Sequence, residues 1–428
     1  MMRLLSARSR RRTQFSSDRW CTPARKSARQ RLPHTAILCG ILACAGEDAK
    51  APRSAVSVTD SSGVQITISP DGETRYAVVD SQPTLSIGGP REQDASQFFN
   101  IQGMAVDSGG NIWIANRATN EVRIFRSDGS LWKTSGRSGG GPGEFRRVRL
   151  LGIFQENRVA VWDDANPRLT VLTAAGELES LVPINVEGST LNAVRVFPDG
   201  SLLVRVPQVI AAQAAEGKLI PDTSSLLRYD LARDTLTAVG TLSGPLWFWT
   251  GQSQVPIAFT INAAYALDDA QAVHIADEPA FRIRVLKDGT RLETYGVDRQ
   301  PRTVTAEHRA AYRDFYQSNM TDGPALRAYL SGLDHPSVPA RLPAYSQLLM
   351  DDRGNTWAQI YSPNLLDAPS WDVYGLDHAW LGKVETPAGL IVNVISGDAV
   401  VGVWRDDLGV EHVRSYRFVV RNTAALGP

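Results

Sequence analysis

Three polar residues recur at the same place in a repeating pattern, and their side chains could bind a cation. Asn116, Asp163 and Asp277 each follow directly after the second short apolar segment of their unit. Amide and carboxylate oxygens are the hard ligands that Ca²⁺ prefers, so the three residues are candidate calcium ligands. We favour the alternative that they accept hydrogen bonds from backbone N–H groups at strand ends, because the other units offer no obvious fourth ligand.

Other chemistry-bearing residues point to no catalytic centre. A zinc site built from three histidines would need histidine at matching positions of several units, whereas His274 aligns with Trp113 and Trp357 and is therefore expected in the core. The glycine-rich residues 136–143 lack the Lys-Ser/Thr pair of a phosphate-binding loop, so we interpret them as a turn. The sequence therefore predicts no catalytic residue.

The charge distribution argues against nucleic acid as a partner. The whole chain has 45 basic and 45 acidic residues, but residues 1–44 hold ten of the basic residues and one acidic residue. The remainder has 35 basic and 44 acidic residues, a net charge of −9. Phosphate binding needs clustered lysine and arginine, so we expect no nucleic-acid partner.

The N-terminal residues predict export. A basic stretch is followed by the mostly apolar residues 35–43, a run too short to span a bilayer as a helix but typical of a secretory signal. Residues 41–44, Ile-Leu-Ala-Cys, resemble a bacterial lipobox, which implies that Cys44 carries a lipid anchor. The alternative is that Cys44 is only an apolar residue of the leader. We therefore predict a signal peptide over residues 1–44 and a flexible linker over residues 45–62.

The elements that position the candidate residues are short strands in repeated units. Residues 103–131 and residues 151–178 share one order of strands and turns, with Gly129 of the first unit aligned with Gly176 of the second. Six such units, of about four antiparallel strands each, predict an all-β fold, a six-bladed β-propeller over residues 63–422. The sixth unit has only three strands, so we expect residues 83–88 to supply its fourth, with residues 63–68 alongside.

The loop that follows the first unit carries a family resemblance. Residues 136–145, Gly-Arg-Ser-Gly-Gly-Gly-Pro-Gly-Glu-Phe, come after Arg-Ile-Phe-Arg-Ser-Asp-Gly at 123–129 and resemble the inter-blade signature of NHL-like six-bladed propellers found in bacterial lipoproteins of unassigned function. In six-bladed lactonases of the gluconolactonase type, rings of Asn, Asp and Glu hold a central metal. That resemblance is what would make Asn116, Asp163 and Asp277 ligands of a calcium ion.

One stretch departs from the strand pattern. Within residues 303–335 two segments place aromatic and apolar residues at helical spacing, the first of them after Thr305. We predict a small helical insertion between the fourth and fifth units, which either covers an apolar rim or forms a lid over one mouth of the channel.

Together these features predict a binding or scaffold protein of the bacterial cell envelope, exported and held at the membrane by its lipid anchor on the periplasmic face or at the outer membrane. A protein, peptide or carbohydrate ligand would bind at a mouth of the propeller, where loops of several units converge. The alternative is a calcium-dependent, gluconolactonase-like hydrolase or lyase that acts at the central channel, since propellers host both kinds of function.

Overall fold

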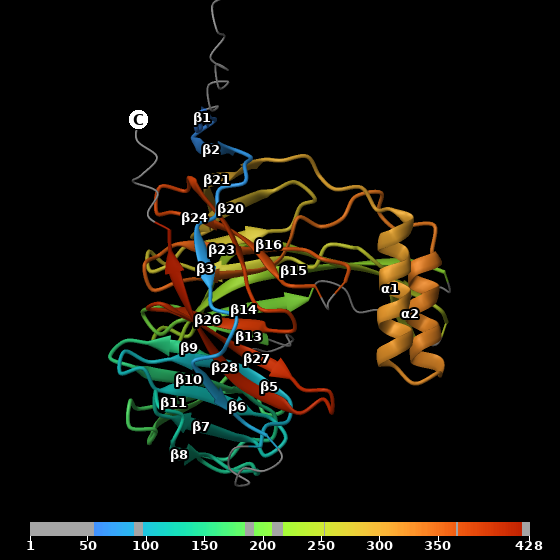
Figure 1. The fold of residues 1–428 in the computed structure, drawn as a ribbon. Coiled ribbons are helices and arrows are strands. Elements are labelled where there is room, and N and C mark those ends of the chain that lie inside the picture. Colours follow the sequence, from blue (N-terminus) through green and yellow to red (C-terminus); the bar gives the residue numbers. More distant parts are fainter. Residues whose placement is uncertain are drawn as a thin grey trace, which may run out of the picture. The chain divides into compact units, whose positions relative to one another are not determined.

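The computed structural model describes residues 55–89, 97–184, 192–207, 217–251, 253–364 and 367–421. Strands make up most of this part of the chain, and two helices lie side by side at one side of the sheets (Figure 1). No helix of the described ranges combines the length and the apolar character that a membrane crossing requires. The predicted signal peptide and its Cys44 lie outside the described residues.

Three of the sheets are regular and have four antiparallel strands each, in which every strand pairs with the next one along the chain. The first sheet contains β5 (Ile101–Val106), β6 (Ile112–Asn116), β7 (Glu121–Phe125) and β8 (Leu131–Ser135). The second contains β9 (Val148–Phe154), β10 (Arg158–Asp163), β11 (Arg168–Leu172) and β12 (Leu178–Pro183). The fifth contains β22 (Tyr345–Met350), β23 (Thr356–Ile360), β24 (Ser370–Tyr374) and β25 (Trp380–Glu385).

The other three sheets of the described residues are larger. The third contains β13 (Asn192–Val196), β14 (Leu202–Pro207), β15 (Leu219–Asp230), β16 (Thr235–Trp249) and β17 (Gln254–Pro256). The fourth contains β18 (Ala264–Leu267), β19 (Val273–Ala276), β20 (Arg282–Lys287) and β21 (Thr290–Asp298), extended by β2 (Val64–Pro70) and β1 (Ser57–Ser61). The sixth contains β26 (Ile391–Ser396), β27 (Ala399–Arg405) and β28 (Glu411–Val420), with β3 (Ala77–Val79) and β4 (Leu85–Ile87).

The N-terminal strands complete the sixth sheet. β4 pairs antiparallel with β28, with Leu85 opposite Ser415 and Ile87 opposite Val413, and β3 pairs with the end of the same strand. The expectation that residues 83–88 supply the missing strand is thus confirmed. This pairing covers an edge of β28 that would otherwise expose unpaired backbone groups.

Two expectations for the N-terminal residues are wrong. Residues 63–68 were expected beside the sixth sheet, but β2 pairs in parallel with β21 of the fourth sheet. The linker was expected to reach residue 62, but residues 57–61 form β1, which pairs with β2 through the turn at Ser62 and Gly63. The physical reason is that the open outer edge of β21 offers backbone partners to this segment.

Asp-containing turns join several of the hairpins. Between β5 and β6, the Asp107 carboxylate accepts hydrogen bonds from the backbone N–H groups of Gly109 and Asn111 and from the Trp113 indole, each at 2.9 Å. Asp351 and Trp357 repeat this contact between β22 and β23, at 3.0 Å. The carboxylate therefore holds both the turn and a core side chain in place.

The cores of the described residues join consecutive sheets in a cycle. Six clusters of buried apolar side chains each combine two sheets, and the last one combines the sixth sheet with the first. In chain order, the clusters include Trp113 with Val161, Trp162 with Val204, Leu203 with Ile275, Tyr295 with Tyr345, Trp357 with Tyr416, and Val413 with Ile114. Each sheet thus buries both of its faces against two neighbours.

The predicted helical insertion is confirmed as α1 (Ala306–Asn319) and α2 (Pro324–Asp334). α1 begins after Thr305, whose side chain accepts a hydrogen bond from His308 N–H in a capping box. Helix α2 contacts β17, and Ala258 N–H donates to Gly332 O at 3.2 Å. The hairpin therefore covers Ala258 and Phe259, which are buried with Leu333 in a cluster of their own.

Candidate functional site

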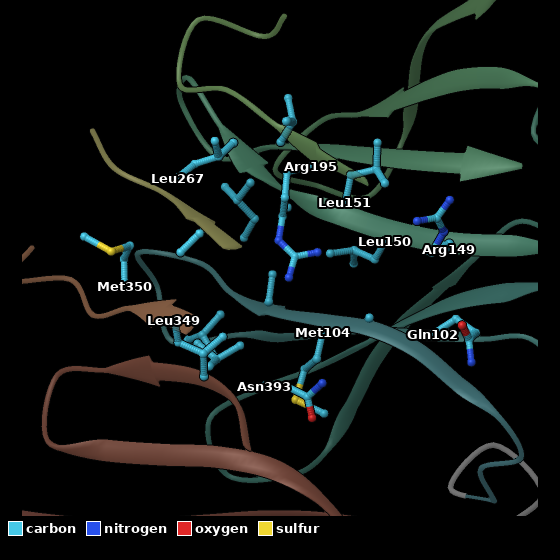
Figure 2. Close-up of a pocket in the computed structure, with 18 of the residues that line it drawn as sticks. Gln102, Met104, Arg149, Leu150, Leu151, Arg195, Leu267, Leu349, Met350 and Asn393 are labelled. Carbon is cyan, nitrogen blue, oxygen red and sulfur yellow. The ribbon is translucent and has the colours of Figure 1, made fainter. Parts of the chain in front are cut away.

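A cavity of about 540 Å³ lies where six strands meet, one from each of the six sheets in the described residues. β5, β9, β13, β18, β22 and β26 each contribute side chains to its wall (Figure 2). Ligand sites of proteins are typically concave and of this size, and convergence of several elements brings residues far apart in the sequence to one place. This cavity is therefore the candidate site.

The polar side chains of the wall are amides and arginines. Gln102, Gln347 and Asn393 carry the amides, and Arg149 and Arg195 carry the positive charges. Among the described lining residues there is no aspartate or glutamate. The cavity therefore favours a negatively charged or neutral ligand over a cation.

β-bulges set the direction of two of these side chains. The ladder between β13 and β14 skips Val194, directly before Arg195, and the ladder between β26 and β27 skips Asn393. A bulge adds one residue to a strand and re-aims the side chains near it. Figure 2 shows Arg195 extending from its strand into the middle of the cavity, toward the side that carries Met104 and Asn393.

The two arginines differ in their partners. Arg149 donates to Asp164 at 2.6 Å and to the Asn192 side chain at 2.5 Å, and Asp164 also forms an ion pair with Arg117. The Arg195 guanidinium donates to the backbone carbonyl of Val194 at 2.9 Å, and its Cζ lies 5.9 Å from the centroid of the Tyr265 ring. In the described part of the chain Arg195 forms no ion pair with a carboxylate, and its side chain lines the cavity.

The amides lie on neighbouring strands. Gln347 donates to the carbonyl of Val392 at 2.9 Å, which fixes it beside Asn393. The Oδ1 atom of Asn393 is buried and has no hydrogen-bond partner among the described residues. An unpaired buried amide oxygen is costly, and the Asn393 residue that carries it is part of the cavity wall.

The predicted site residues lie elsewhere. Asn116 is fully buried, accepts from Phe99 N–H at 3.0 Å and donates to Thr119 at 2.9 Å. Phe99 precedes β5, so the amide fixes the chain where it enters the first sheet. Asn116 is not part of the cavity wall.

Asp163 and Asp277 have equivalent local roles. Asp163 is fully buried and accepts from the backbone N–H groups of Arg146 at 3.1 Å and Arg147 at 2.9 Å. Asp277 accepts from Ser243 N–H at 3.3 Å and pairs with Arg284 at 2.7 Å. The hydrogen-bonding role that we favoured for these residues is the one observed.

The structure does not bring the three residues into one cluster, since each belongs to the hydrogen-bond network of a different sheet. Across the described ranges, no group of three or more His, Cys, Asp or Glu residues is placed to hold a metal ion. A calcium site at Asn116, Asp163 and Asp277 stays a prediction.

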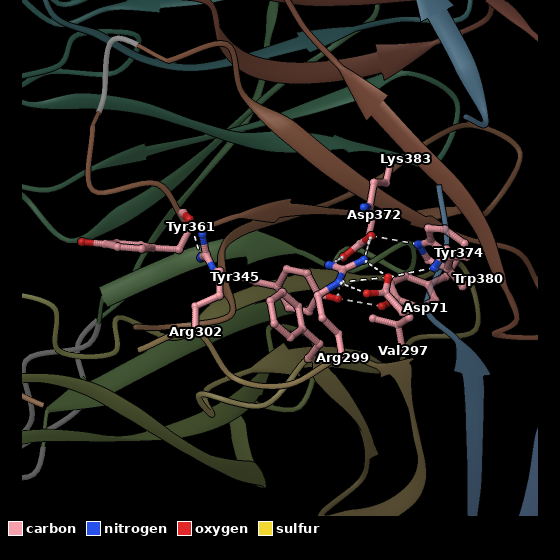
Figure 3. A network of polar contacts seen from close by, with 12 residues as sticks. Asp71, Val297, Arg299, Arg302, Tyr345, Tyr361, Asp372, Tyr374, Trp380 and Lys383 are labelled. Carbon is pink, nitrogen blue, oxygen red and sulfur yellow. Dashed lines mark hydrogen bonds and ion pairs between the residues drawn. The ribbon is translucent and has the colours of Figure 1, made fainter. Parts of the chain in front are cut away.

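A second polar cluster lies in the core between the fourth and fifth sheets (Figure 3). Arg299 forms ion pairs of 2.8 Å with the fully buried Asp372 and with Asp71, which follows β2. The Trp380 indole and the Tyr345 hydroxyl also donate hydrogen bonds to Asp372. Burial alone would lower the pKa of Arg299, but its hydrogen bonds to the two aspartates raise it above its ordinary value. Because each charge is paired, this cluster is a structural one.

His274 is buried in the same core, as its alignment with the tryptophans predicted. Its Nδ1 lies 2.7 Å from the Tyr295 hydroxyl and its Nε2 lies 3.2 Å from Asp268. Burial of Asp268 would by itself raise the pKa of that carboxyl, but hydrogen bonds from His274 and Ala272 N–H hold it below its usual range. The imidazole therefore takes the place that an indole has in the first and fifth sheets.

Sequence reasoning missed the residues of the cavity wall. Each of these residues lies on the innermost strand of its unit, but Arg149, Arg195 and Asn393 stand at different positions relative to the bulge of their strand, so no repeated pattern identifies them. The usual alternation of side chains between the two faces of a strand does not predict these positions, because each bulge adds a residue and shifts the alternation.

Comparison with known proteins gives likeness at the level of three-dimensional shape. No protein-family model matches the chain, and no curated protein matches its sequence. A DUF4221-family protein from Bacteroides vulgatus has a TM-score of 0.49 at 11% identity, covering 81% of this chain and 99% of that one. A gluconolactonase from Xanthomonas campestris has a TM-score of 0.41 at 13% identity, covering 82% and 99%.

A third similar structure is virginiamycin B lyase from Staphylococcus aureus, with a TM-score of 0.39 at 9% identity, covering 78% of this chain and 99% of that one. These three proteins differ in what their names describe, and none of them assigns an activity or a ligand to this chain.

Proposed function

We propose that this chain is a ligand-binding module, in which six sheets act as the blades of one closed β-propeller and the ligand occupies the central cavity. The observation that carries the proposal is the convergence of six first strands on a polar cavity of about 540 Å³. The cyclic order of the core clusters supports closure of the ring, because each sheet has a neighbour on both faces. The wall of the cavity comes from six strands far apart in the sequence, and a concave site of this kind suits binding.

A cavity-filling substitution tests this proposal. Leu349 lies on β22, lines the cavity and is partly exposed, so Leu349→Trp places an indole where the ligand would bind. Leu131→Trp is the matched control, since Leu131 lies on the outer strand β8 and is exposed. A panel of small metabolites is screened against all three proteins by thermal shift, with circular dichroism as the check of folding.

Compounds that stabilise the wild-type protein should lose their effect in Leu349→Trp and keep it in Leu131→Trp. The proposal fails if stabilisation survives in a folded Leu349→Trp variant, because the binding site would then lie outside the cavity.

The calcium-dependent hydrolase or lyase remains the competing hypothesis, and it has less support. The carboxylates of Asp163 and Asp277 already accept backbone N–H groups and arginine side chains, which occupies the lone pairs that a metal needs. Calcium titration of the wild-type protein, with magnesium as the control, tests it. A calcium-specific rise in melting temperature would favour the enzyme.

We further propose that the protein is exported and held at the cell envelope through a lipid on Cys44. The support is the sequence of residues 35–44, and the test is independent of the cavity. Cys44→Ser should release the protein from the membrane fraction into the soluble fraction. Unchanged membrane retention of that variant would contradict the anchor.

A further inference from the structure

We infer that the ligand of the central cavity is a small organic carboxylate with a polar body, whose carboxylate pairs with Arg195. The inference rests on the proposed function, because it names the chemical class that the same cavity would bind.

The first step is the sign of the charge. Arg195 and Arg149 are the charged side chains of the wall, and no aspartate or glutamate is among the described lining residues. Arg149 is paired with Asp164, so Arg195 carries the unbalanced positive charge of the wall. Asp164, the partner of Arg149, is not among the residues that line the cavity. A concave site with positive charge and low-dielectric walls concentrates anions and repels cations.

The second step is the number of charges. The two guanidinium groups of Arg149 and Arg117 already share the Asp164 carboxylate, whereas Arg195 has only the Val194 carbonyl as a hydrogen-bond partner in the described residues. Its remaining N–H groups are free to donate into the cavity. A planar guanidinium fork matches a carboxylate in a bidentate pair, and one such fork balances one negative charge.

The third step is the body of the ligand. Asn393 lies on the side of the cavity toward which Arg195 extends (Figure 2). The Gln347 amide also lines the cavity and is held next to Asn393 by its hydrogen bond to the Val392 carbonyl. Amide side chains both donate and accept hydrogen bonds, so this part of the wall suits a ligand with a polar body. The ligand should therefore carry hydroxyl or amide N–H groups in addition to its carboxylate.

Sugar acids and short peptides both have this chemistry, and the experiment separates them. The probes are D-galacturonate against neutral D-galactose, and N-acetyl-dialanine against its neutral C-terminal amide. Binding to the purified protein is measured by isothermal titration calorimetry at matched ionic strength. We expect at least one carboxylate to bind and its neutral counterpart to bind at least about tenfold more weakly, because the charged pair with Arg195 is lost.

The variants locate the binding. Arg195→Gln should weaken the carboxylate roughly 10- to 100-fold, and Arg195→Lys should restore part of the affinity, because lysine keeps the charge but not the fork. Arg126→Gln is the matched control, since Arg126 is an exposed arginine beside Trp132 at the outer hairpin of the first sheet, and it should bind as the wild type does.

The outcomes separate this inference from the proposed function. If neither carboxylate binds, or if Arg195→Gln binds both as tightly as the wild type, the inference is overturned. If charged and neutral probes bind equally and Leu349→Trp abolishes both, the cavity is the ligand site but its ligand is not selected by charge. If Leu349→Trp leaves all binding intact, the proposed function falls as well.

Discussion

The imidazole of His378 stacks on the phenol ring of Tyr295, with ring centroids 4.2 Å apart and an interplanar angle of 6°. His378 lies in the turn between β24 and β25, and Tyr295 is fully buried on β21. The stack therefore joins the fifth sheet to the fourth. A hydrogen bond of 2.5 Å from His378 Nδ1 to Glu293 Oε2 fixes the imidazole over the phenol ring.

Protonation of His378 should weaken folding as the pH falls. Burial lowers the pKa of His378 below its ordinary value, and nearby His274 lowers it further, which outweighs the opposite effect of the Glu293 and Asp268 carboxylates. The unfolded chain then binds the proton more readily than the folded protein does. The contribution to stability is complete above about pH 6.5, the unfolded pKa, and is lost as the pH falls below it.

Urea unfolding between pH 5 and pH 8 measures this effect. The free energy of unfolding should rise with pH over the acidic part of the range, and His378→Gln should flatten that part of the curve. Glu293→Gln removes the carboxylate that favours the protonated imidazole, so it should lower the pKa of His378 further. A wild-type curve that His378→Gln leaves unchanged in slope would contradict the assignment.

Loss of Arg299 should destabilise the protein strongly. Arg299→Met leaves the fully buried Asp372 without its cation, and removing one partner of a buried ion pair costs about 3–5 kcal/mol. The control is Arg417→Met, because the ion pair of Arg417 and Asp398 is exposed on both sides. That variant should change the free energy of unfolding by no more than about 0.5 kcal/mol. If the two variants lowered the free energy of unfolding equally, the network of Figure 3 would contribute no more to stability than an exposed ion pair.

The fold and the Arg299 network show how much of this structure the sequence could predict. Repeated strands and Asp-Gly turns are local patterns, so the unit order and the helical insertion could be found from them. The pairing of residues 83–88 with β28 is not local, but the missing fourth strand of the sixth unit indicated it. The parallel pairing of β2 with β21 joins segments more than 200 residues apart, and no local pattern encodes it. Arg299 lies between elements, where neither strand nor helix periodicity predicts which acids it meets.

The candidate site was less predictable than the fold. Asn116 and Asp163 stand out in sequence because they recur, but the same recurrence follows from the need to fix the chain where it enters each sheet. Arg195 and Asn393 have no repeated counterpart, and bulges decide where they point. Repetition therefore identified structural residues, whereas the residues that line the cavity differ from sheet to sheet.

A methyl group at Gly382 should disturb the packing of residues 74–76 against β25. Gly382 has φ +139°, and a Cβ there would lie 2.6 Å from Thr74 O and 2.8 Å from Tyr76 N. Residues 74–76 pair in parallel with Lys383 of β25 before β3 joins the sixth sheet. Gly382→Ala should therefore push this segment away from β25, at a cost of about 1–3 kcal/mol in the free energy of unfolding.

Gly409→Ala is the control for backbone strain alone. Gly409 also has a positive φ, +76°, but a Cβ there would meet no atom within 4 Å. It should cost only about 1–2 kcal/mol, from the left-handed backbone conformation. In urea unfolding Gly382→Ala should be the less stable of the two, and hydrogen exchange at residues 74–79 should rise in that variant only. The opposite order of stability would show that residues 74–76 do not pack against β25.

The helical hairpin should detach locally when Gly332 gains a side chain. A Cβ at Gly332 would lie 1.9 Å from the carbonyl oxygen of Pro256, so Gly332→Ala forces α2 away from β17 and exposes the buried Leu333. Gly323→Ala is the matched control in the same hairpin, because its Cβ would lie 3.8 Å from the nearest atom, Thr321 O. Limited proteolysis should cut Gly332→Ala within residues 303–335 faster than the wild type or Gly323→Ala. The sheets of Gly332→Ala should still unfold in one cooperative transition, as in the wild type. If Gly332→Ala instead unfolds the entire protein at once, the hairpin is part of the main folding unit and not an appendage docked on the third sheet.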